Sequence, residues 1–107
     1  MGIISKPLEL EAMIEKLIAT PSVSCIDTAI DQSNAAVIHI LAEWLEKLGF
    51  QTQILAIDDK NEKFNLIATI GKGCGGLVLA GHTDTVPYDL NRWTTDPFKL
   101  KEKNHGL

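Results

Sequence analysis

The chain has 107 residues, of which 45 % are hydrophobic and 22 % charged, and its formal net charge is −4. This length allows one small domain, and the composition is typical of a globular chain rather than a disordered one. A mild negative charge without acidic or basic blocks disfavours nucleic acid and anionic membranes as partners. The sequence shows neither an apolar run of about 20 residues nor a secretory leader pattern, so we expect a cytoplasmic protein.

The two cysteines, Cys25 and Cys74, lie far apart in the sequence. A disulfide between them is possible in principle. An intracellular chain without a Cys-x-x-Cys pair more often keeps its cysteines reduced, and we therefore expect two free thiols.

Two amphipathic segments predict helices. The first covers residues 7–19, where Pro7 suits a first helical turn and Thr20-Pro21 ends the helix. Its apolar positions recur at helical spacing: Leu10, Met13, Ile14, Leu17 and Ile18. The second covers residues 28–48, with Thr28 and Asp31 at capping-box spacing and Gly49 at the C-cap. Its apolar stripe consists of Ala36, Val37, Ile40, Leu41, Trp44, Leu45 and Leu48. The polar stretch 22–25 between the two helices is predicted to be a loop.

Three strands are predicted after the helices. Residues 50–57 are half polar, as in a one-sided strand, and residues 64–70 alternate around Phe64, Leu66, Ala68 and Ile70. Residues 77–80 read Leu-Val-Leu-Ala without a break, which is typical of a strand covered on both faces. The glycine-rich stretch 71–76 lacks the Lys-Ser/Thr of a phosphate-binding loop, so it predicts a short hairpin loop between antiparallel strands.

The remaining sequence predicts a loop up to residue 97, a short strand over 98–101 and a turn over 104–106, with Leu107 beginning a return strand. The predicted fold class is therefore α/β, with helices packed on a mixed sheet. We expect residues 1–107 to form the first part of a larger domain.

The segment from Gly81 to Pro87 contains the residues best suited to chemistry. His82 and Asp84 are two apart, so in an extended chain their side chains point to the same side. A neutral imidazole is a common zinc ligand, and a carboxylate on its other nitrogen fixes the ring. One imidazole cannot hold a catalytic zinc, so the spacing alone leaves open a structural pair at a strand end. His39, predicted to be partly buried on its helix, and His105 in a turn are weaker candidates.

The same heptapeptide, Gly-His-Thr-Asp-Thr-Val-Pro, resembles the first metal motif of the di-zinc amidohydrolase and exopeptidase family, which includes aminoacylases and succinyl-diaminopimelate desuccinylase. Residues 17–24 and 64–71 resemble the end of the family's first helix and the strand before its metal strand. Residues 31–34 and 92–98 are most similar to the branch of the family that deacetylates N2-acetylornithine.

The resemblance implies a part of a di-zinc peptidase-like catalytic domain. It implies that His82 is a ligand of one of two zinc or cobalt ions and that Asp84 is the catalytic-site carboxylate that orients it. The general base, the other ligands and a dimerisation domain would follow residue 107, and the whole protein would be a homodimer. The implied reaction converts N2-acetylornithine to ornithine and acetate, a step of arginine biosynthesis, while the chain by itself is expected to be inactive. The alternatives are another acyl-amino-acid hydrolase, such as the desuccinylase or an aminoacylase, and a non-catalytic assembly fragment.

Overall fold

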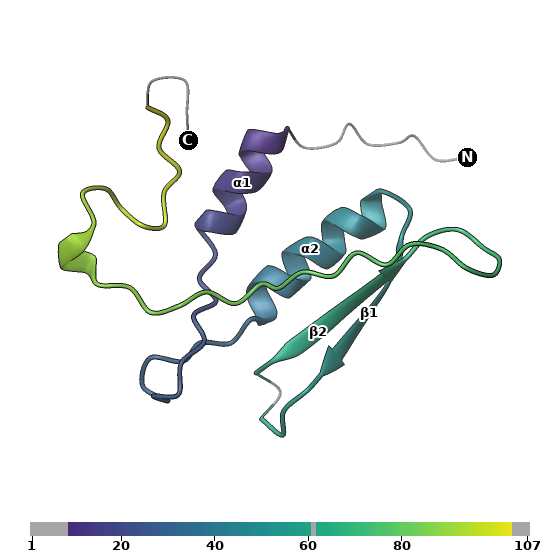
Figure 1. The fold of residues 1–107 in the computed structure, drawn as a ribbon, viewed down its shortest axis with the longest axis horizontal. Helices are drawn as coiled ribbons and strands as arrows, with labels where there is room; N and C mark the ends of the chain where they lie inside the picture. The colour runs from purple at the N-terminus through teal and green to yellow at the C-terminus, as the bar shows by residue number, and fades with distance from the viewer. Residues whose placement is uncertain (1–8, 61, 104–107) are drawn as a thin grey trace.

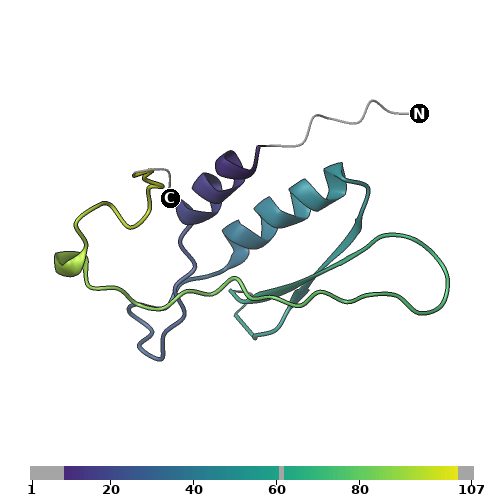
Figure 2. The ribbon, with the colours of Figure 1, turned by 45° about the horizontal axis from the view of Figure 1, so that its top comes forward.

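The computed structural model describes residues 9–60 and 62–103. Two helices, α1 (Leu10–Ile18) and α2 (Ala35–Lys47), precede a hairpin of β1 (Gln51–Ala56) and β2 (Phe64–Thr69). Helix α2 packs on the hairpin, and α1 lies on the far side of α2 (Figures 1 and 2). The α/β class is thus confirmed. The mixed sheet is not, because the two strands pair antiparallel.

Helix α1 agrees with its predicted range wherever the structure describes it, since Pro7 lies outside the described residues. The helix ends before Pro21, and the Thr20 hydroxyl donates to the Lys16 carbonyl at 2.7 Å. None of the nine residues of α1 is buried. Leu17 and Ile18 near its end instead line an open groove.

Helix α2 begins at Ala35, seven residues later than predicted, and the capping pair Thr28/Asp31 is wrong. The residues before Ala35 are bonded to other parts of the chain. The Asn34 side chain pairs with the backbone of Phe64 in both directions, at 2.9 and 2.8 Å. The Ser33 hydroxyl accepts from the Ala35 N–H at 3.1 Å. These bonds hold the preceding segment away from helical geometry and set the helix start.

The buried face of α2 consists of Val37, Ile38 and Ala42. Only Val37 belongs to the predicted stripe, because the helix packs against the hairpin on one side and borders an open groove on another. It packs on both strands of the hairpin, while Val37 and Leu41 line the groove. His39 is exposed, so the prediction of a partly buried histidine there is wrong.

The hairpin follows the predicted alternation. Ile54 pairs with Leu66 and Thr52 with Ala68, and these residues are less exposed than their neighbours along each strand. Alternating side chains of a strand point to opposite faces, so this is the face that α2 covers. The outer face of the hairpin is exposed.

Gly49 ends α2 in the predicted left-handed conformation, with φ of +94°. Its N–H donates to the Glu46 carbonyl and the Phe50 N–H donates to the Leu45 carbonyl, each at 3.0 Å. This pair of bonds is a Schellman motif, which turns the chain from α2 directly into β1.

Replacing Gly49 with alanine should lower the free energy of unfolding by about 1–2 kcal/mol, because left-handed backbone penalises an L side chain. A Cβ at Gly49 would lie 3.9 Å from Ile70 Cδ1, an ordinary contact, so the loss comes from the backbone. At Gly81, φ is not left-handed and no atom lies within 4 Å of an added Cβ. Gly81→Ala should therefore stay within about 0.5 kcal/mol of the parent in urea unfolding. Equal losses in the two variants would contradict this account.

The strand predicted over residues 77–80 is absent. The side chains of Leu77, Val78 and Leu79 are 84 %, 88 % and 86 % exposed. Within the described chain, these residues make no backbone hydrogen bond to β2, although Gly71, Gly73, Gly75 and Gly76 form a loop with positive φ after it. Burial on both faces requires covering layers, and the only packed layer among the described residues, α2, covers β1 and β2.

The strand predicted over residues 98–101 is also absent. A turn occupies its start, where the Phe98 N–H donates to the Asp96 carboxylate at 2.9 Å and the Lys99 N–H to the Asp96 carbonyl at 3.2 Å. The preceding loop contains a 3₁₀ helix, Leu90–Arg92. The predicted turn at 104–106 and the return strand at Leu107 lie outside the described residues.

Both cysteines are free thiols, as predicted, with Cys74 exposed and Cys25 half-buried. Among the helices of the described residues, none has the length and apolar character needed to cross a membrane.

Candidate functional site

His82 and Asp84 lie together, as their spacing predicts. His82 Nδ1 is 2.9 Å from Asp84 Oδ1 and 3.2 Å from the Asp84 carbonyl oxygen. Both oxygens are acceptors, so the geometry assigns a hydrogen to Nδ1, and in the neutral ring the Nε2 lone pair is then left without a hydrogen bond. The two side chains are 84 % and 58 % exposed. The imidazole thus presents its free nitrogen to the surroundings, which is the state that a metal ligand requires.

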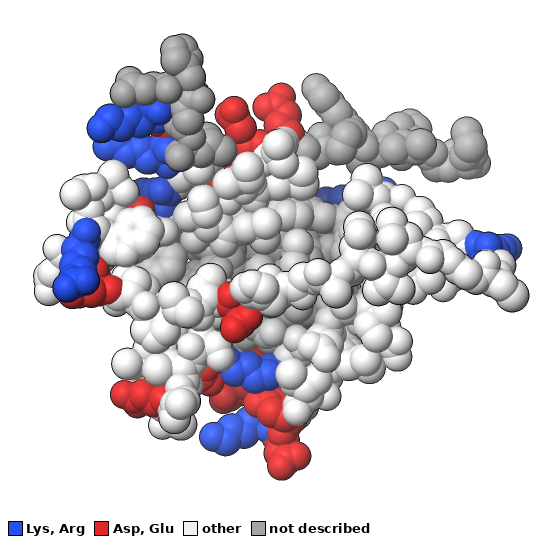
Figure 3. All heavy atoms as spheres, in the orientation of Figure 1, with Lys and Arg blue, Asp and Glu red and all other residues white. Residues whose placement is uncertain are grey.

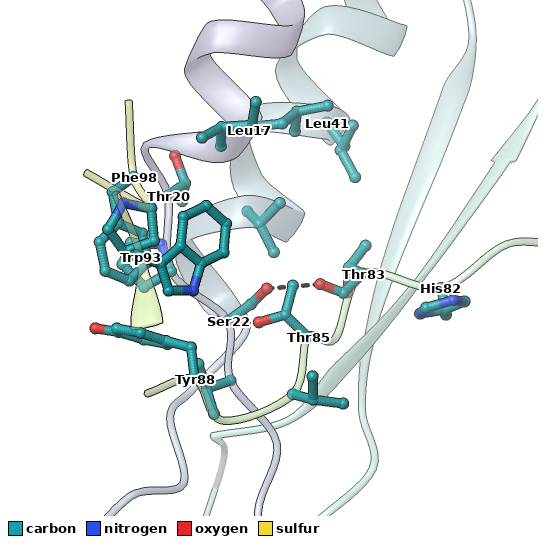
Figure 4. Close-up of a pocket in the computed structure, with 16 residues that line it drawn as sticks. Leu17, Thr20, Ser22, Leu41, His82, Thr83, Thr85, Tyr88, Trp93 and Phe98 are labelled. Carbon is teal, nitrogen blue, oxygen red and sulfur yellow. Dashed lines mark hydrogen bonds between the residues drawn. The ribbon is translucent and has the colours of Figure 1, made fainter. Parts of the chain in front are cut away.

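The pair does not sit at the end of a buried strand, because residues 77–80 form none. Its support comes from the segment between the helices. Val23 and Thr85 form a parallel bridge, in which the Ser24 N–H donates to the Thr85 carbonyl at 2.9 Å. The Thr85 N–H donates to the Ser22 carbonyl at 3.1 Å. The Ser22 hydroxyl adds a bond to the Thr83 carbonyl at 2.6 Å (Figure 4).

An open groove of about 630 Å³ lies beside this bridge, with His82 among its lining residues. Most of the lining is apolar or aromatic and comes from α1, α2 and the segment after His82 (Figure 4). Tyr88 and Phe98 meet edge to face on its wall, with ring centroids 5.2 Å apart. Most of the face in Figure 3 is uncharged, with one acidic group near its centre, and most charged side chains lie around its rim. Such a surface favours apolar contact and offers few polar groups for orienting a ligand.

A second polar cluster fixes the loop that carries the bridge. The Asp31 carboxylate accepts from the Cys25 N–H at 2.8 Å and from Lys63 Nζ at 3.0 Å. Lys63 also donates to the Gln32 carbonyl. The side chains of Lys63 and Asp31 are each only 24 % exposed. The hydrogen bond from the Cys25 N–H, followed by the one from Lys63, lowers the pKa of Asp31 below its ordinary value of 3.8.

This lowered pKa makes stability depend on pH in the acid range. Asp31 stabilises the fold above pH 3.8, and this contribution is lost as the pH falls through the lower pKa of the folded state. The melting temperature of the parent should therefore fall more steeply below about pH 4 than that of Asp31→Asn, which cannot ionise. Asp59→Asn, at an exposed carboxyl in the hairpin loop, should keep the slope of the parent. Parallel curves for the parent and Asp31→Asn would contradict this role.

Among the described residues, the structure does not bring other candidate ligands to His82, and His105 lies outside these residues. His39 is exposed on α2, and Asp89 and Asp96 each accept a hydrogen bond from a backbone N–H two residues ahead. Within residues 9–60 and 62–103, no three His, Cys, Asp or Glu side chains lie close enough to share a metal ion. Among these residues, no further side chain of a kind that binds metal accompanies the His82–Asp84 pair.

Sequence reasoning missed Ser22, which lies in the segment interpreted only as a polar loop. Its side chain is 3 % exposed, the one buried polar residue of the described chain. The available signal was its place beside Pro21, inside a segment that resembles the family's first helix end. The contact it makes is 61 residues away in sequence, which no local pattern reveals.

No family model matches the chain. Several curated proteins are nevertheless closely similar to it. The acetylornithine deacetylase of Proteus mirabilis (strain HI4320) is 56 % identical over 103 residues, which cover 94 % of this chain and 27 % of that protein. The acetylornithine deacetylase of Yersinia pseudotuberculosis serotype I is 57 % identical over 96 residues, with 85 % and 25 % covered. That of Photorhabdus laumondii is 50 % identical over 95 residues, with 89 % and 25 % covered.

The chain spans about a quarter of the length of these proteins. Identity of 50 % or more over nearly the whole chain agrees with the resemblance inferred from the segments around His82. The chain is therefore a relative of the acetylornithine deacetylases, matching them over most of its own length and about a quarter of theirs.

Proposed function

We propose that this chain supplies one metal ligand and its orienting carboxylate to a cytoplasmic, metal-dependent hydrolase that converts N2-acetylornithine and water to ornithine and acetate. The observation that carries the proposal is the His82–Asp84 contact at 2.9 Å, which leaves Nε2 free. The similarity to acetylornithine deacetylases supports the choice of substrate.

In this proposal His82 holds a zinc or cobalt ion through Nε2, and Asp84 keeps the hydrogen on Nδ1. The donor set fits this role, because a histidine that binds metal through one ring nitrogen usually donates a hydrogen bond from the other nitrogen to a carboxylate or a carbonyl. The bound metal would polarise the acetyl carbonyl and lower the pKa of a water molecule. The hydrolysis breaks the amide C–N bond, forms a C–O bond and leaves the proton on the ornithine amine.

A hybrid enzyme tests the proposal. In it, the 103-residue segment of the Proteus mirabilis acetylornithine deacetylase that matches this chain is replaced by the sequence of this chain. We expect the hybrid to hydrolyse N2-acetylornithine in the presence of zinc or cobalt, in preference to N-succinyl-diaminopimelate and other N-acyl amino acids. A folded hybrid that prefers another substrate of the panel would overturn the assignment.

The chain by itself should show no turnover of N2-acetylornithine. A zinc ion in a catalytic site needs about three protein ligands, and His82 is the one matched ligand here. The assay uses the purified chain with added zinc or cobalt, alongside His82→Ala. Turnover that survives purification and disappears in the variant would contradict the expectation, whereas turnover equal in both would indicate a contaminating enzyme.

A further inference from the structure

The segment that carries His82 and Asp84 is held in place by few contacts. Both side chains are largely exposed, and Leu77, Val78 and Leu79 before them are 84 %, 88 % and 86 % exposed. Between His82 and Asp84, only Thr83 is half-buried, where it lines the groove. The hydrogen bonds to the segment around Ser22 are the directional contacts that hold this backbone.

Ser22 takes part in two of these hydrogen bonds, one through its side chain and one through its backbone. Its hydroxyl donates to the Thr83 carbonyl at 2.6 Å, and its own carbonyl accepts from the Thr85 N–H at 3.1 Å. Thr83 and Thr85 are the immediate neighbours of Asp84, so Ser22 holds the chain on both sides of that residue. Asp84 contacts His82 Nδ1 with both its carboxylate and its carbonyl, and each contact depends on how this backbone is oriented.

Ser22 itself stands on a fixed base. Its neighbour Val23 exchanges two hydrogen bonds with Gln32, at 2.8 and 2.9 Å. The loop continues to Asp31, which Lys63 of the hairpin holds at 3.0 Å. A continuous series of bonds thus joins the hairpin to the backbone around Asp84, and Ser22 is its last side chain.

We propose that Ser22 is a positioning residue for the His82–Asp84 pair. Through the Thr83 carbonyl, its hydroxyl holds the backbone in the conformation that brings both Asp84 oxygens to Nδ1, and so keeps Nε2 as the free nitrogen. The value of this for metal binding rests on the proposed function. The positioning itself is a property of the chain without metal.

The test follows the imidazole tautomer of His82 in the complete 107-residue chain. Long-range proton–nitrogen NMR spectra are recorded at about pH 8.5, above the ordinary range of imidazole titration. His82→Gln identifies the resonances. The parent should show His82 protonated at Nδ1. In Ser22→Ala the bonded arrangement should be roughly fivefold less populated relative to open ones, the equilibrium factor of one net hydrogen bond, and the spectra should move towards a mixture of tautomers.

Ser24→Ala is the matched control. Ser24 belongs to the same bridge, but it takes part only through its backbone N–H, and its side chain is exposed. Its variant should keep the tautomer of the parent. Folded Ser22→Thr, which retains a hydroxyl, should keep the tautomer of the parent. A merely structural role for Ser22 would change the melting temperature without changing the tautomer.

If the alanine variant does not fold, Ser22→Cys takes its place. A thiol is similar in size to a hydroxyl but a weak donor, so this variant should also shift the spectra towards a mixture of tautomers. A parent-like tautomer in folded Ser22→Ala or Ser22→Cys would overturn the proposal. Because the spectra are recorded without metal, that result would leave the assignment of His82 as a ligand intact. Conversely, a hybrid enzyme that works without His82 would overturn the assignment and leave the positioning intact.

Discussion

The His82→Ala variant of the hybrid enzyme should lose activity towards N2-acetylornithine by well over about 100-fold. The loss should exceed the 10–100-fold that is usual when only the partner of a metal ligand is removed, because here the ligand itself is lost. Bound metal, measured by atomic emission after dialysis, should fall together with kcat. The methyl side chain of alanine has no lone pair to replace Nε2.

His39→Ala is the matched control for this variant. His39 is exposed on α2 and has no place in the proposed site, so its replacement should leave kcat and metal content within about twofold of the parent. A His82→Ala hybrid that retained more than about a tenth of the activity would contradict the role of His82 as a ligand.

Asp84→Asn should lower the activity or metal affinity of the hybrid about 10–100-fold. The amide oxygen of asparagine can still accept the Nδ1 hydrogen at the position of Oδ1, which lies 2.9 Å away. It lacks the negative charge that makes the opposite nitrogen a stronger donor to metal. The expected loss is therefore smaller than for His82→Ala, and raising the metal concentration should recover part of it.

Asp59→Asn removes a carboxylate from the exposed hairpin loop and should leave activity unchanged. It controls for the change in net charge that both aspartate variants share. Activity of Asp84→Asn within twofold of the parent would show that the carboxylate is not needed to orient His82. The contact seen in the structure would then be incidental to catalysis.

The parts of the fold that depend on near neighbours could be predicted from the sequence. The spacing of apolar residues predicted both helices, α1 and α2. Gly49 predicted where α2 ends, because a helix cap depends on residues within one turn. The start of α2 could not be found in this way. It depends on Asn34 bonding to Phe64, 30 residues away, and such bonds compete with helix formation in a manner that no local pattern carries.

Residues 77–80 are a case in which a clear local pattern predicted a strand that the structure does not contain. An unbroken apolar run indicates that burial would be favourable, but burial also needs surfaces to bury against. Among the described residues the hairpin and α2 cover one another, and no layer remains for Leu77 or Leu79. The apolar pattern indicates a need for burial, and the described residues provide no layer that meets this need.

In the candidate site, too, the local contact could be predicted from the sequence and the long-range one could not. The contact between His82 and Asp84 spans two residues and follows from the geometry of an extended chain. The support by Ser22 spans 61 residues and depends on how two loops cross, so only the structure reveals it.

The exposed run at residues 77–80 has a consequence for the lifetime of the chain. Its backbone belongs to no helix or strand, its large aliphatic side chains are open to solvent, and a loop with several glycines precedes it. Proteases that cleave beside aliphatic residues require just such an accessible segment. A single cut there would separate the hairpin, which anchors Asp31 through Lys63, from the covalent chain of His82 and Asp84. Survival of the intact polypeptide in a cell would then depend on how accessible this run is to such proteases.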